Sequence, residues 1–97
     1  MLFTVNKAPL TGNSLASVLR IAPAGAPILL YEDGVYAALE GSSSQELVIR
    51  ALQDHPVYAL KEDLEARGIH RIIQGVQTID YAGFVELVEQ HNVAPWL

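Results

Sequence analysis

The chain has 97 residues, contains no cysteine and carries a net charge of −5. A chain of this length supports one hydrophobic core, so we expect a single domain over residues 1–97. Without cysteine the chain can have no disulfide, no thiolate metal ligand and no cysteine nucleophile. The acidic charge argues against direct binding to a nucleic acid.

Hydrophobic residues make up 51% of the chain and charged residues 18%, against roughly 25% charged residues in an ordinary soluble domain. This is more apolar surface than so small a core can hide, so we expect part of it to face another subunit. No uncharged run approaches the ~20 residues of a membrane helix. The initial apolar run is also too short for a signal peptide, so we expect a cytoplasmic protein with no membrane contact.

The first half of the chain alternates between strand and helix patterns. Leu2–Val5 predicts a strand, and residues 14–21 predict a helix that is capped by Asn13 or Ser14 and stopped by Pro23. Ile28–Tyr31 is an apolar run without alternation, as expected of a parallel strand covered on both faces. These patterns predict the first crossover of a parallel sheet.

The segment Glu32–Val35 follows that strand directly, and a short helix is expected to begin near Gly34. Ligands and partners bind at the carboxyl ends of the strands in open sheets, so this segment is a candidate site. Glu32 and Asp33 could act as a general acid or base. The favoured interpretation is that Asp33 caps the helix while Glu32 faces solvent or a partner.

The second half continues the alternation. Ser43 and Glu46 match a capping box in front of a second helix, and Val57–Leu60 predicts a third strand. A brief helix over residues 62–67 should end at Gly68, with Asp63 and Arg67 spaced for an ion pair.

A fourth strand is expected within Ile72–Ile79, split at Gly75. Asp80 should cap the last helix, whose buried stripe is expected to contain Phe84, Leu87 and Val88. An apolar tail follows, from Val93 to Leu97. The whole pattern predicts an α/β fold: a small three-layer sandwich with a mostly parallel sheet of four to five strands flanked by helices.

Three other groups of residues are candidates for chemistry. Residues 11–14, Thr-Gly-Asn-Ser, resemble the phosphate loop of flavodoxins, but four common turn residues are better explained as a helix start. Ser42, Ser43 and Ser44 lack the glycine spacing of a nucleophile elbow. The three histidines (His55, His70 and His91) lie in separate segments without a second ligand, so we expect no metal site.

The order of several short motifs resembles the TusB/DsrH family almost end to end. They are Asn6-Lys7 with Pro9, Glu32-Asp33-Gly34-Val35 with Ala37-Ala38-Leu39, Val57–Leu60 followed by Glu62-Asp63-Leu64 and Ala66-Arg67-Gly68, Asp80-Tyr81 with Phe84-Val85, and Trp96 near the end.

This resemblance implies the smallest subunit of a cytoplasmic heterohexamer that passes sulfur as a persulfide, with TusC/DsrF-like and TusD/DsrE-like subunits as partners. The persulfide cysteine belongs to the TusD or DsrE subunit. One branch serves 2-thiolation of the tRNA wobble uridine, and the other serves dissimilatory sulfur oxidation. The oxidation branch has a cysteine in the first helix, where the corresponding residue here is Val18.

We therefore expect a non-catalytic subunit without catalytic, cofactor-binding or metal-binding residues, most simply in the tRNA branch. The interface candidates are Glu32, Asp33, Gly34, Val35 and Trp96. Trp96 is equally suited to packing on its own core or docking on a partner. Three alternatives stay open: a DsrH-type subunit of the complex that serves dissimilatory sulfur oxidation, a small FMN-binding or ligand-binding α/β protein, and a homo-oligomer that acts without the larger subunits.

Overall fold

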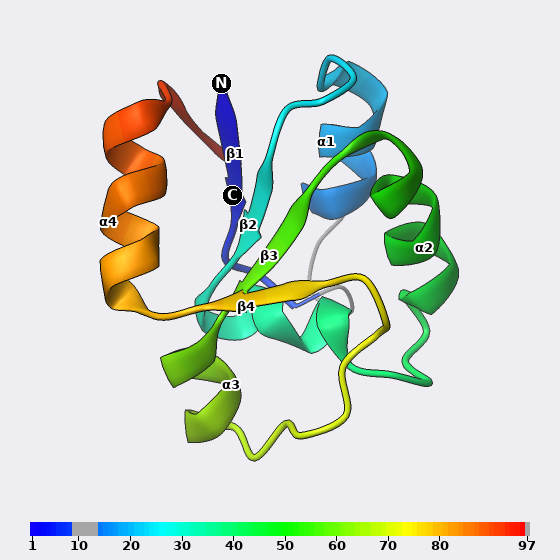
Figure 1. Ribbon diagram of the computed structural model, residues 1–97. Helices are drawn as coiled ribbons and strands as arrows, with labels where there is room; N and C mark the ends of the chain where they lie inside the picture. The colour runs from blue at the N-terminus through cyan, green and yellow to red at the C-terminus, as the bar shows by residue number, and fades with distance from the viewer. Residues whose placement is uncertain (9–13, 97) are drawn as a thin grey trace.

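Five parallel strands form one sheet with helices on both faces (Figure 1). The computed structural model describes residues 1–8 and 14–96. Its elements in chain order are β1 (Leu2–Val5), α1 (Ser14–Ile21), β2 (Ile28–Leu30), the 3₁₀ helix η2 (Glu32–Ala38), α2 (Gln45–Asp54), β3 (Val57–Leu60), α3 (Lys61–Ala66), β4 (Gln77–Ile79), α4 (Tyr81–Gln90) and β5 (Val93–Trp96). The expected α/β class with a parallel sheet is confirmed.

The strands lie in the order β4-β3-β2-β1-β5, which places β2 at the centre. All three residues of β2 are fully buried. A strand that is covered on both faces has no solvent side and so needs no polar alternation, which explains its unbroken apolar run. The strand ends at Leu30, one residue earlier than predicted.

The C-terminal apolar segment, expected to be a tail, forms a strand. β5 pairs in parallel with β1, and Val93 lies opposite Leu2 in the register. The strand contains Pro95, which has no N–H to donate to the ladder of hydrogen bonds. Proline is tolerated on an edge strand, and β5 is at the edge of the sheet.

The two faces of the sheet are covered unequally. Figure 1 shows α1 and α2 on one side and α4 on the other, by itself among the helices of the described residues. The side with α1 and α2 holds the larger core, which includes Phe3, Val18, Ile28, Val48 and Val57. The α4 side holds a smaller core of Leu2, Leu29 and Leu87, with Tyr58, Ile79 and Phe84 packed against it.

The predicted buried stripe of α4 is wrong at one position. Leu87 is buried and Phe84 packs against the smaller core, but 39% of Val88 is exposed. Successive helical residues are rotated by about 100°, so Val88 lies beyond the side of the helix that meets the sheet. Val88 therefore contributes an apolar side chain to the surface of the molecule.

The predicted capping box before α2 is also wrong. Ser44, not Ser43, is the N-cap, and its side chain makes no capping hydrogen bond. Its buried hydroxyl instead donates to the carbonyl oxygen of Ala37 at 3.1 Å, while the Gln45 side-chain oxygen accepts from the Gly41 N–H. The serine therefore joins α2 to η2 rather than closing its own helix.

Other features predicted from local sequence patterns are present in the structure. The Gly83 N–H donates to Asp80 Oδ1 at 2.9 Å, which confirms Asp80 as the cap of α4. Gly68 has a φ of +66°, as expected of a left-handed residue that ends α3. The fourth strand lies within Ile72–Ile79 as predicted, but it is not split, because it covers only Gln77–Ile79 and Ile72 forms an isolated antiparallel bridge with Leu39 outside it.

The helices are short. α2 and α4 have 10 residues each, and α3 has 6. Within the described ranges, 1–8 and 14–96, no helix has the length and apolar character needed to cross a membrane.

Gly34 is the point where the chain passes closest to its own backbone. A Cβ atom at this position would lie 2.1 Å from the carbonyl oxygen of Val5. The same oxygen accepts the Tyr31 N–H at 3.1 Å, so η2 begins directly against the end of β1. Only glycine leaves room for this approach, since a backbone carbonyl in a buried strand cannot move aside.

We expect Gly34→Ala to lower the free energy of unfolding by about 3 kcal/mol, because the new methyl group overlaps a fixed backbone oxygen. Gly41→Ala is the matched control. A Cβ at Gly41 meets no atom within 4 Å, although its φ is +83°. The control should therefore lose only about 1 kcal/mol through backbone strain. Urea unfolding of both variants tests this, and equal losses would show that the close approach is unimportant.

Candidate functional site

The candidate segment Glu32–Val35 forms the start of η2 at the carboxyl edge of the sheet. α3 follows β3 at the same edge, and Figure 1 shows η2 and α3 together at the lower ends of the strands. Parallel topology brings them there, because every strand of this sheet ends on the same side. The position of the segment was therefore predictable from the sequence.

Arg67, at the end of α3, joins the two elements. Its Nη2 lies 2.9 Å from Asp33 Oδ1, and its Nε donates to the same oxygen at 3.0 Å. Its Nη1 lies 3.6 Å from Asp63 Oδ1, which confirms the pair expected from the i,i+4 spacing. The predicted cap is wrong: the N-cap of η2 is Tyr31, with no side-chain bond, and Asp33 binds Arg67 instead.

Asp63 also fixes the backbone of the candidate segment. Glu32 has a φ of +49°, the one positive φ outside glycine in the described part of the chain. Its N–H donates to Asp63 Oδ2 at 2.5 Å. A left-handed conformation costs roughly 1–2 kcal/mol for a residue with a Cβ, and this charge-assisted hydrogen bond offsets that cost. Asp63 thus binds the Glu32 N–H through Oδ2 and the Arg67 side chain through Oδ1.

The interface candidates fall into different environments. Glu32 and Asp33 are exposed, whereas Gly34 and Val35 are buried within the protein. Val35 belongs to the larger core, so the surface of this segment is made by the two carboxylates. Trp96 is the last residue of β5, and its backbone is held beside Val5. Its side chain lies outside the described residues.

Two buried oxygen atoms at the same edge were not anticipated from the sequence. Asn6 Oδ1 and Glu62 Oε1 have no hydrogen-bond partner within residues 1–8 and 14–96. The other oxygen of Glu62 accepts the Tyr81 N–H at 3.4 Å, which connects α3 to the start of α4. The signal in the sequence was the position of each residue, directly or closely after a buried strand.

His55 and Ser44 are engaged in structural hydrogen bonds. His55 is buried, and its Nδ1 lies 2.9 Å from the Ala26 carbonyl oxygen. Ser44 is engaged with Ala37 as described above. In the part of the chain that the structure describes, no three His, Asp or Glu side chains are grouped so as to hold a metal ion.

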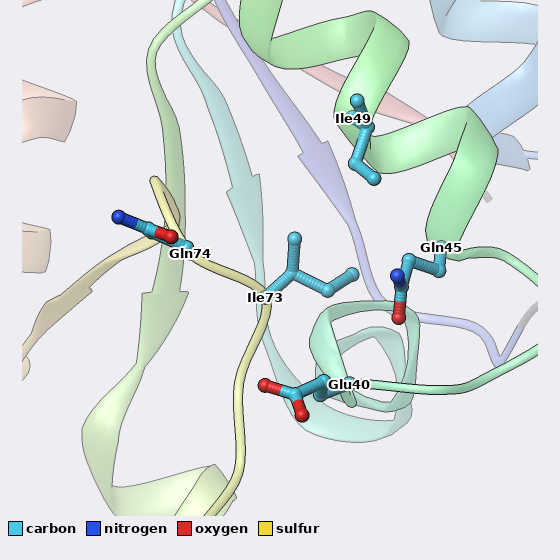
Figure 2. Close-up of a pocket in the computed structure, with 5 residues that line it drawn as sticks. All are labelled: Glu40, Gln45, Ile49, Ile73 and Gln74. Carbon is cyan, nitrogen blue, oxygen red and sulfur yellow. The ribbon is translucent and has the colours of Figure 1, made fainter.

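An open hollow lies between α2 and the loop before β4. Figure 2 shows Gln45 and Ile49 on α2, Ile73 and Gln74 on the loop, and Glu40 after η2. Amide and aliphatic side chains form this lining, with one carboxylate. These five residues include no serine, histidine, lysine or arginine.

The flavin alternative rested on residues 11–14. Thr11, Gly12 and Asn13 lie outside the described residues, as does the side chain of Ser14. The structure therefore leaves that prediction as it stood.

Comparison with known proteins identifies the family. The model of the family described as "DsrH like protein" matches residues 7–94. The chain is 42% identical over 93 residues to Protein TusB of Serratia proteamaculans and 40% identical over 95 residues to Protein TusB of Escherichia coli O81, with 95% of each chain covered in both cases. The chain belongs to the TusB/DsrH family.

Solved structures share its fold. The ychN protein from E. coli superposes with a TM-score of 0.79 at 21% identity, covering 98% of this chain and 97% of the other. Protein Tm0979 from Thermotoga maritima gives a TM-score of 0.65 at 28% identity, covering 94% of each chain. TusB/DsrH membership supports a role as a subunit of a sulfur-relay complex.

Val18 corresponds to the cysteine expected in the oxidation branch. It lies in α1 and is completely buried in the larger core. At this position the side chain packs against the sheet and does not reach the surface. The chain contains no cysteine at this or any other position.

We expect Asp63→Ala to lower the free energy of unfolding by about 1–2 kcal/mol, because it removes the acceptor for the Glu32 N–H and a partner of Arg67. Asp63→Asn keeps an oxygen that can accept from Glu32, so its loss should be about half as large. Urea unfolding at pH 7 measures both. If the two variants lost the same stability, the hydrogen bond to Glu32 would have no part in holding the turn.

Proposed function

We propose that this protein is a non-catalytic subunit of a cytoplasmic heterohexamer that relays persulfide sulfur to the 2-thiolation of the tRNA wobble uridine. The observation that carries the proposal is the combination of full-length similarity to proteins named TusB with a chain that contains no cysteine. A persulfide needs a thiol to carry it. The chain contributes structure and binding surface, and a TusD-like partner contributes the thiol.

The carboxyl edge of the sheet fits this role. Its charged residues are used to join η2 to α3, through the ion pair of Arg67 with Asp33 and the hydrogen bond from Glu32 to Asp63. Glu32 and Asp33 remain exposed and are the part of this segment that can contact a partner. We propose them as interface residues, together with the C-terminal strand that ends at Trp96.

Coexpression of this protein with the TusC-like and TusD-like subunits of its own organism tests the assembly. We expect the three chains to purify together and to give the mass of two copies of each on native mass spectrometry. Deletion of the gene should then abolish 2-thiouridine in tRNA, and the wild-type gene should restore it. A protein that stays alone in the presence of both partners would overturn the proposal. Unchanged 2-thiouridine would overturn the tRNA branch.

A cysteine placed at position 18 tests whether this site could carry sulfur. We expect Val18→Cys to fold normally, because the two side chains are similar in size, and its thiol to stay unreactive, because position 18 is fully buried. Reaction with a thiol reagent should become fast only in urea. Ser17→Cys, on the neighbouring half-buried position, is the matched control. Rapid labelling of the native Val18→Cys protein would show that α1 opens to solvent.

A further inference from the structure

The helix α4 carries a row of apolar side chains that its own core does not use. Tyr81, Val85 and Val88 are 54%, 50% and 39% exposed. Their spacing of four and then three residues places them on one side of the helix, next to the side where Phe84 and Leu87 meet the sheet. α4 is therefore apolar over more of its circumference than the sheet can cover.

Val93 extends this surface onto the sheet. It pairs with Leu2, and paired residues of parallel strands point to the same face. Leu2 packs with Leu87, so this face is the one that α4 covers. Val93 is nevertheless 40% exposed, which shows that α4 leaves the β5 edge open. We call the four residues Tyr81, Val85, Val88 and Val93 the α4 patch.

The charges around the patch select its occupant. The charged residues of α4 are Glu86 and Glu89, and the helix has no lysine or arginine. Glu89 lies four residues after Val85 and so borders the patch directly. A second copy docked patch to patch would bring the same glutamates together within a chain of net charge −5. Like charges placed together at an interface oppose association.

We propose that the α4 patch is the docking surface for a subunit of different sequence, which presents an apolar surface bordered by lysine or arginine. The inference rests on the proposed function, because it takes that subunit from the relay complex. Interfaces combine a desolvated apolar centre with a polar rim, and the patch with Glu89 at its border has this composition. It lies on α4 and β5, apart from the exposed carboxylates of η2.

The test uses the coexpressed complex of the three chains and the double variant Val85→Glu/Val88→Glu. We expect at least a tenfold loss of partner subunits that copurify, because charges replace two apolar contacts at the centre of the interface. Gln90→Glu is the matched control, since it adds a charge to the same helix at an exposed position off the patch. Both variants should keep the wild-type circular dichroism spectrum and unfolding midpoint, because neither substitution touches the core.

Charge reversal tests the nature of the partner. Glu89→Lys should weaken the complex several-fold at low salt, with a smaller effect at 0.5 M salt where such contacts are screened. If Val85→Glu/Val88→Glu copurified its partners as well as the wild-type protein does, the α4 patch would be overturned as the interface. The proposed relay complex would be unaffected. If the wild-type protein copurified with neither partner, the result would overturn the proposed function. A homo-oligomer that the double variant dissociates would then assign the patch to a second copy and overturn the inference.

Discussion

The approach of Gly34 to the carbonyl oxygen of Val5 is the constraint on which the carboxyl edge of this sheet depends. It lets the chain leave the central strand and turn at once beneath β1, so that η2 starts with no intervening loop. This tight path requires a left-handed residue at Glu32, and the left-handed residue requires the hydrogen bond to Asp63. Arg67 is held by Asp63 and in turn holds Asp33. The missing side chain at position 34 therefore sets the use of two carboxylates, Asp33 and Asp63.

That chain of dependence explains why an acidic strand end need not be an active site. Adjacent carboxylates after a buried strand are the residues from which many sites are built, and the same residues also satisfy backbone N–H groups and guanidinium groups in a tight connection. Here the second use accounts for Asp33 and Asp63 through contacts of 2.5–3.6 Å.

The sequence predicted the parts of the fold that depend on local patterns. Buried strands, the cap at Asp80, the left-handed end at Gly68 and the Asp63–Arg67 pair all follow from residues within a few positions of one another. The errors have the opposite origin. Asp33 binds a residue 34 positions away, Ser44 donates to Ala37 on another helix, and β5 depends on pairing with the first strand of the chain. Such contacts are decided by the tertiary arrangement, which local spacing does not encode.

Val88 shows how a wrong prediction can be the more informative one. The sequence pattern of α4 assigned it to the core because the helix has more apolar positions than one sheet-facing stripe requires. The structure fills that stripe with Phe84 and Leu87 and leaves Val88 exposed beside Val85. The same excess was already visible as a chain with 51% hydrophobic residues and 18% charged ones. The composition indicates surplus apolar surface. The structure places part of it on α4, whose charged residues are all acidic.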